Sequence, residues 1–150
     1  MKHLTRHARV LVTDGGRATV LRNEGDAAHP DLRPVRTYEH DTPPTRDLGT
    51  DKPFRGNNPS GDRSSIEGVD YHQQAEDRFI AMVAGDMQAD LKAGKFEEII
   101  IVAPPVALGV YRKLATPELI RATVKEINKD LTKHSNAEIA AAVVKALEAD

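Results

Sequence analysis

Polar side chains that could bind or catalyse are concentrated in one segment of the chain, Asp41 to His72. Guanidinium groups, hydroxyls and an imidazole are all present there, and together they could hold a phosphate or a carboxylate. The residues concerned are Arg55, Arg63, Ser64, Ser65 and His72. Nearby acidic residues could instead pair with the arginines and keep the segment soluble. Both interpretations stay open, and the segment is the best candidate binding surface, because long loops often carry function.

The same residues also allow a catalytic interpretation. His72 lies close to Glu76 and Asp77 in sequence, and a neighbouring carboxylate can orient and charge an imidazole that acts as a general base. With Ser64 or Ser65 as the nucleophile, the protein would be a hydrolase of a phosphate- or acyl-containing small molecule. Neither serine lies in the Gly-x-Ser-x-Gly turn that exposes such a nucleophile, so the hydrolase is kept as an alternative.

A second candidate site is the turn Asp14-Gly15-Gly16-Arg17. Its backbone amides and the Arg17 guanidinium could bind an anion. Adjacent glycines between two apolar runs are also typical of a β-hairpin, where glycine supplies a positive φ. The hairpin is the favoured interpretation, and Arg17 is retained as a candidate binding residue.

The sequence offers no motif for a metal ion or a cofactor. It has no cysteine, which excludes disulfides, thiolate zinc sites and a cysteine nucleophile. Its six histidines lack the helical His-Glu-x-x-His spacing. We therefore expect no metal site and no cofactor.

Length and composition predict one globular domain spanning residues 1–150. Hydrophobic residues make up 39% of the 150-residue chain and charged residues 29%, which is ordinary globular usage. A net charge of -2 argues against a generally basic nucleic-acid-binding protein. No apolar run is long enough to span a membrane, and the first residues do not form a signal peptide. We expect a cytoplasmic protein that does not interact with membranes.

Three short strands are expected to open the domain, at residues 9–13, 18–23 and 34–39, and together they predict an antiparallel meander. From Asp41 to His72 no apolar periodicity survives among many prolines and glycines, which predicts one long polar loop. Beyond it, apolar residues recur every four positions and predict a helix of about 16–18 residues that ends near Gly94. These residues are Phe79, Val83, Met87 and Leu91.

The continuous apolar run at residues 98–103 is typical of a strand covered on both faces, and so of the centre of a sheet. Pro104 and Pro105 end it, and a short helix is expected over residues 106–114. A helix should begin after Thr116, but residues 119–131 fit either a continuing helix or a strand at 123–128, with periodicity alone favouring the helix. A capping box from Ser135 to Glu138 predicts a last helix.

Three stretches resemble, in the same order, the signature sequences of the host-attachment protein family. They are Val10 to Ala18 (VLVTDGGRA), Ile101 to Gly109 (IVAPPVALG) and Glu126 to Thr132 (EINKDLT). Residues 61–65 and His72 extend the resemblance into the loop. That family is similar to the middle domain of archaeal and eukaryotic class 1 release factors. The resemblance implies an α/β fold: a mixed five-stranded RNase H-like sheet, three antiparallel strands then two parallel, with flanking helices and with 123–128 as the last strand.

Two departures limit what this resemblance implies about activity. Release factors present a Gly-Gly-Gln loop, whereas Gly15-Gly16 is followed here by Arg17, so peptide release is not implied. The strands also lack the carboxylate cluster that two-metal nucleases need. We therefore expect a non-catalytic binding module, associated with the ribosome, an RNA or a protein partner. The family name adds one further alternative, a factor required indirectly for attachment to host cells.

Overall fold

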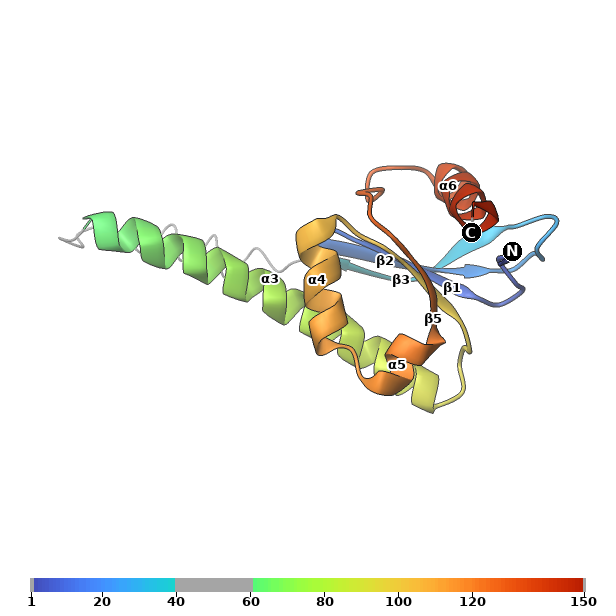
Figure 1. The fold of residues 1–150 in the computed structure, drawn as a ribbon, viewed down its shortest axis with the longest axis horizontal. Coiled ribbons are helices and arrows are strands. Elements are labelled where there is room, and N and C mark those ends of the chain that lie inside the picture. The colour runs from blue at the N-terminus through green and yellow to red at the C-terminus, as the bar shows by residue number, and fades with distance from the viewer. Residues whose placement is uncertain (1, 40–60, 150) are drawn as a thin grey trace.

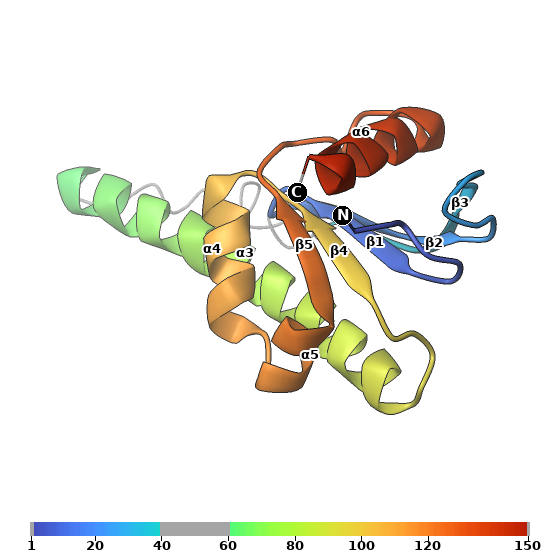
Figure 2. The same ribbon diagram turned by 45° about the vertical axis from the view of Figure 1, so that its right-hand side comes forward.

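The computed structural model describes residues 2–39 and 61–149, with residues 61–72 described by their backbone alone. The strands are β1 (Arg9–Thr13), β2 (Arg17–Asn23), β3 (Leu32–Glu39), β4 (Ile99–Val102) and β5 (Thr123–Ile127). The helices are α3 (Gly61–Lys92), α4 (Pro105–Leu114), α5 (Pro117–Ala122) and α6 (Asn136–Glu148). In the ribbon views α3, α4 and α5 cover one face of the sheet and α6 covers the other (Figures 1 and 2).

The strands form one mixed sheet in the order β3-β2-β1-β4-β5. Antiparallel pairs join β3 to β2 and β2 to β1, whereas β1 pairs with β4, and β4 with β5, in parallel. The expected α/β fold with three antiparallel and two parallel strands is confirmed. Two hydrophobic cores follow from this layering, because the central strands are covered on both faces.

Alternate residues of β1 and β4 supply both cores. Leu11 and Ile101 lie in the core beneath α3, while Val10, Ile100 and Val102 lie in the core beneath α6. All four residues of β4 have exposed fractions of 0%. The continuous β-branched run therefore gave the right prediction, since a strand with two buried faces has no polar alternation.

Helix α3 is much longer than its apolar stripe predicts. Phe79, Val83 and Met87 are buried against the sheet, as expected, but the helix begins at Gly61. Residues 61–72 are therefore helical, which corrects the predicted loop of residues 41–72; residues 41–60 lie outside the described residues. The error has a physical cause: apolar periodicity reports the buried face of a helix, whereas each residue added to an existing helix gains a backbone hydrogen bond whatever the type of its side chain.

The ambiguous segment after Thr116 is a short helix followed by a strand. Thr116 caps α5 by accepting a hydrogen bond from the amide of Leu119 at 3.2 Å. The helix ends at Ala122, and β5 then pairs with β4 and buries Ile127 at its end. The strand implied by the family resemblance is thus confirmed, and the helix favoured by periodicity is wrong. Tertiary pairing with β4 decides between two patterns that the sequence satisfies equally.

The predicted helix starts elsewhere are confirmed. Pro105 occupies the first turn of α4, where its missing N–H leaves no hydrogen bond unmade. In α6 the Ser135 hydroxyl accepts from the Glu138 amide at 3.1 Å, and the Glu138 carboxylate accepts from the Ser135 amide at 2.9 Å. Reciprocal capping of this kind is local, which explains why sequence alone predicts it.

Candidate functional site at the carboxyl edge of the sheet

Strands β1, β4 and β5 run parallel to one another and end at the same edge of the sheet, where the segments that follow them lie close together. The turn after β1, the Pro104 turn before α4 and residues 128–134 after β5 all lie at this carboxyl edge. Figure 1 shows the N-terminal part of α3 projecting past the sheet at the same end. Ligands of open α/β sheets usually bind at the carboxyl edge, so this edge is the first candidate for a functional site.

The turn after β1 is held together by Asp14. One oxygen of its carboxylate, Oδ1, accepts hydrogen bonds from the amides of Gly16 at 2.9 Å and Arg17 at 2.8 Å. The Thr13 hydroxyl donates to the Arg17 carbonyl at 2.8 Å, and Gly15 has a φ of 98°. These are the contacts of a hairpin turn with glycine at a positive φ. Two amides that an anion could use already donate to Asp14, while the side chain of Arg17 is exposed.

Residues after β5 are tied to the same turn. The Thr132 hydroxyl lies 2.7 Å from Asp130 Oδ1 and 3.4 Å from Asp14 Oδ2. Because the hydroxyl has a single hydrogen, it donates mainly to Asp130. This hydrogen bond, with a second from the Thr132 amide, holds the pKa of the Asp130 carboxyl below its ordinary value. Both carboxylates thus accept hydrogen bonds that stabilise the loops at this edge.

A shallow groove of about 480 Å³ lies beside the turn, along the paired ends of β2 and β3. Arg17 lines it opposite Glu39, its partner in the strand register, and Thr19 faces Thr37 further along. The groove combines hydroxyls with one cation and one anion. It offers hydrogen bonds to an elongated polar ligand, and it contains Arg17, the one candidate residue whose side chain the structure describes.

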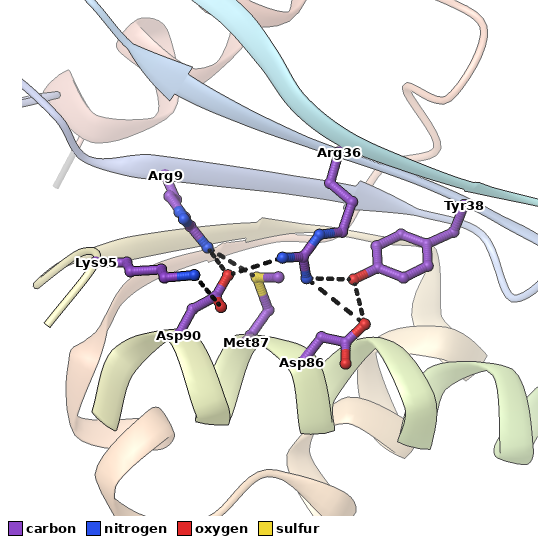
Figure 3. Close-up of polar contacts among 7 residues, drawn as sticks. All are labelled: Arg9, Arg36, Tyr38, Asp86, Met87, Asp90 and Lys95. Carbon is purple, nitrogen blue, oxygen red and sulfur yellow. Dashed lines mark hydrogen bonds and ion pairs between the residues drawn. The ribbon is translucent and has the colours of Figure 1, made fainter. Parts of the chain in front are cut away.

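Helix α3 is fixed to the sheet by a network of charged and polar side chains, which Figure 3 shows in the layer between the strands and the helix. Arg9 of β1 donates to Asp90 of α3 at 2.7 Å, and the side chains are only 5% and 8% exposed. Arg36 of β3 lies 3.4 Å from Asp90 and 3.5 Å from Asp86, one helical turn earlier. A buried pair of this kind is costly to break, because the remaining charge has no solvent.

The surroundings of Arg9 and Asp90 explain their charge states. The Arg9 guanidinium lies over the Phe96 ring, 4.7 Å from its centroid, a favourable cation–π position. Burial alone would raise the pKa of Asp90, but the hydrogen bond and charge of Arg9, with the charges of Arg36 and Lys95, hold that pKa below its ordinary value. The carboxylate is therefore ionised at neutral pH.

Tyr38 completes the network on the strand side. Its hydroxyl donates to Asp86 at 2.7 Å and accepts from Arg36 at 2.9 Å. Burial raises the pKa of Tyr38 to about 12, and the hydrogen bond from Arg36 opposes that rise. The ring also meets Phe79 edge-on, with 6.4 Å between centroids. Contacts from β1 and β3 thus hold the C-terminal half of α3 in one position, and this fixes the direction in which the N-terminal half leaves the sheet.

Most of the candidate residues from the sequence lie on the part of α3 that projects. The backbone of residues 61–72 places Arg63, Ser64, Ser65 and His72 on one continuous helix, with their side chains outside the described residues. Arg55 lies outside the described residues altogether. We call residues 61–78 the arm, because Phe79 is the first residue of α3 described as buried in the core. Residues 73–78 are exposed or half-buried, and at its base Glu76 lies beside Gly15 of the turn.

The helical backbone bears on the hydrolase alternative. In a continuous helix the backbones of Ser65 and His72 are separated by about 10 Å along the axis, because each residue rises about 1.5 Å. A base that activates a serine must approach it to about 2.6–3.2 Å. The proposed pair within this segment gains no support from the helix.

Sequence reasoning missed the residues that hold α3 in place. Asp86 and Asp90 are spaced by one helical turn beside the apolar stripe, and Arg9 is the first residue of a strand that is otherwise almost entirely apolar. A charge at a position expected to be buried is a signal that a partner exists. The partner itself could not be named, because Arg9 and Asp90 are 81 positions apart.

A family model matches residues 7–143. The chain belongs to bacterial archaeo-eukaryotic release factor family 12. The predicted kinship with release factors is thereby confirmed, while host attachment is no part of this family's description. No curated protein matches the chain.

Among solved structures, this family 12 chain is similar to the crystal structure of an archaeal translation termination factor, aRF1. The sequence identity is 12% and the TM-score is 0.45. The alignment covers 95% of this chain and 39% of that factor, so the family 12 chain spans less than half of its length.

Neither a metal-binding group nor a membrane-spanning helix is found in the described part of this family 12 protein. Where side chains are described, no group of three or more histidine, aspartate or glutamate residues is arranged to hold a metal ion. No helix among the described residues is both long and apolar enough to cross a membrane.

Proposed function

We propose that this family 12 protein is a translation-associated, non-catalytic binding module that contacts ribosomal RNA through the arm of α3 and the adjoining carboxyl edge. One observation carries the proposal: α3 has 32 residues, and its N-terminal part projects past the sheet, whereas the buried core residues described on this helix begin at Phe79 (Figure 1). At about 1.5 Å per residue the whole helix is about 48 Å long, so much of it extends beyond the core. Membership of a release-factor family supports translation as the setting.

The physical design of the arm suits contact with a larger partner. An isolated helix is marginally stable in water, so a surface on a partner can add contacts to a helical segment that projects past the sheet. Its direction is already set, because the network around Asp90 and Arg36 fixes the buried half of the same helix. Binding to an element that is already positioned costs less conformational entropy than binding that must first order a free segment.

The chemistry of the candidate residues favours RNA over an apolar partner. Arg63 on the arm and Arg17 at its base carry guanidinium groups, whose planar fork matches phosphate oxygens. The carboxylate of Asp14 accepts hydrogen bonds from the turn, so the edge supports binding more readily than proton transfer. The protein as a whole has a charge of -2, and we therefore expect a few localised phosphate contacts instead of a broad basic surface.

Cosedimentation with ribosomal subunits tests the proposal. The wild-type protein should sediment with subunits at low salt, and binding should weaken as salt rises, because each phosphate contact releases a counterion. Alanine at both Arg55 and Arg63 should reduce the bound fraction and lower the steepness of the salt dependence by about 1 for each arginine that touches a phosphate. Arg121→Ala, an exposed arginine of α5, is the matched control and should bind as wild type.

The result separates the possible partners. Binding to subunits that is unchanged by the double substitution would place the contact elsewhere on the protein. Binding that is independent of salt would point to a ribosomal protein in place of RNA. If no cosedimentation occurs even at low salt, the proposal fails.

A further inference from the structure

A second, separate pocket lies at the opposite, amino edge of the sheet. Its volume is about 280 Å³, and two segments line it: residues 5–8 before β1 and residues 94–98 before β4. Neither segment belongs to the arm or to the carboxyl edge. The pocket is near the lower end of the volumes of small-molecule sites, about 300–1,000 Å³, so it fits a small ligand better than a polymer.

The backbone on one side of this pocket is strained. Ala8 donates to the Thr5 carbonyl at 3.2 Å and closes a turn in which His7 has a φ of 72°. His7 is the one residue other than glycine with a positive φ among the described residues. Glycine would adopt this conformation without steric strain, so a histidine here lowers stability. Strain of this kind is often kept where the side chain has a function.

Surrounding contacts hold the strained turn in place. Asn23 has an exposed fraction of 0%, and its side-chain amide donates to the carbonyls of Leu4 and Thr5, both at 3.1 Å. The His7 amide in turn donates to the Asn23 carbonyl at 2.7 Å. The turn is therefore positioned before any ligand arrives, and ordering it upon binding requires little entropy.

The side chains that line the pocket have unused capacity to bind an anion. Among the described residues, the Arg6 guanidinium and the His7 imidazole form no hydrogen bond or ion pair, and both residues are exposed. Lys95 lies 3.8 Å from Asp90, at the limit of an ion pair, with its side chain 59% exposed. On the acidic side, Glu98 already accepts a hydrogen bond from the Thr5 hydroxyl at 2.6 Å.

We propose that this amino-edge pocket binds the phosphate group of a small phosphorylated molecule. The Arg6 guanidinium supplies a planar fork for two phosphate oxygens, the imidazole N–H of His7 donates a further hydrogen bond, and Lys95 adds a positive charge. Glu97, the remaining acidic residue of the lining, accepts from a hydroxyl beside the phosphate. The ligand class is therefore a sugar phosphate or a nucleoside monophosphate, and the site is independent of the arm.

A substitution that relieves the strain tests this proposal sharply. His7→Gly fits the positive φ, so it should raise the melting temperature while weakening phosphate binding at least tenfold. Arg6→Ala, outside the strained position, should weaken binding to a similar degree with an unchanged melting temperature. Arg33→Ala is the matched control, because this exposed arginine of β3 lies outside the lining and should leave both quantities unchanged.

Binding is read from backbone amide NMR shifts during titration with inorganic phosphate, ribose 5-phosphate, ribose and a short single-stranded RNA. Saturable shifts at residues 5–8 and 94–98 with both phosphates, and none with ribose, are expected. The proposal is overturned if neither phosphate shifts these amides, if the shifts persist in both His7→Gly and Arg6→Ala, or if RNA alone produces them. A lower melting temperature in His7→Gly would likewise contradict the claim that His7 is kept at a cost in stability.

Discussion

Replacement of Asp90 by alanine should be among the most damaging single changes in the protein. The Asp90 side chain is 8% exposed and its partner Arg9 is 5% exposed, so solvent does not screen this ion pair as it screens a pair on the surface. Removing one member of a buried pair leaves the other charge without solvent, at a cost of about 3–5 kcal/mol. For a domain stable by about 5–15 kcal/mol, this is a large share of the total.

Urea denaturation measures the effect, with Asp86→Ala as the matched control. Asp86 lies one turn earlier on α3, but its side chain is 46% exposed, and the Arg36 side chain that it meets is 36% exposed. Losing that pair and the hydrogen bond from Tyr38 should lower the free energy of unfolding by only about 1–2 kcal/mol. The melting temperature of Asp90→Ala should fall on the order of 10 °C, since 1 kcal/mol corresponds to about 2–4 °C in a domain of this size.

A paired replacement decides whether the charges themselves are needed. Arg9→Met combined with Asp90→Leu removes both charges and keeps apolar volume, and its stability should lie within about 1 kcal/mol of wild type or above it. If Asp90→Ala costs no more than Asp86→Ala, then the buried pair does not hold α3 in place and our account of the arm's direction is wrong.

Three further predictions follow from the same contacts. The pKa of Asp90 in the folded protein lies below its ordinary value of 3.8, so the unfolded chain binds the proton more tightly. The stabilisation by the Arg9–Asp90 pair is therefore present above pH 3.8 and is lost as the pH falls through the folded-state pKa. Acid titration of the unfolding free energy should therefore show a smaller loss for Asp90→Asn than for wild type, and equal losses would contradict the assignment. In the arm, Gly68→Ala should increase helical circular dichroism and Gly68→Pro should decrease it, each with the urea midpoint of the core unchanged. Relative to alanine, glycine is less favourable inside a helix by about 1 kcal/mol and proline by about 3 kcal/mol. Gly15→Ala should destabilise the protein by about 1–2 kcal/mol, since the turn needs a φ of 98° and the added carbon would lie 3.4 Å from the Glu76 carboxylate; an unchanged stability would show that the turn relaxes freely.

What the sequence predicted correctly depends on signals that are local or that report burial on both faces. The Ser135–Glu138 capping box involves neighbours along the chain, and the apolar run of β4 reflects cover on two sides. Strand β5 needed the family resemblance, because Val124 and Ile127 fit either periodicity. In β3 the alternation was visible, but sequence does not say which set of side chains faces a helix. Arg36 and Tyr38 do so, while Val35 is 43% exposed.

The candidate site was only partly within reach of sequence reasoning. The absence of apolar periodicity drew attention to residues 41–72 and so to the residues that lie on the arm. It could not reveal that residues 61–72 are helical, since a helix can continue where the sequence shows no apolar stripe. The strained His7 also left no sequence signal, because a positive φ is a property of the folded turn.

Site-specific photo-crosslinking tests the central claim, that the arm contacts ribosomal RNA, most directly. A short photoreactive amino acid is introduced at Ile66 in the arm and, as a control, at Arg121 on α5, and each protein is irradiated with purified ribosomal subunits. We predict a crosslink to ribosomal RNA from position 66 that disappears at high salt, and none from position 121. A crosslink from position 121 alone, or from neither position while the protein still cosediments, would contradict it.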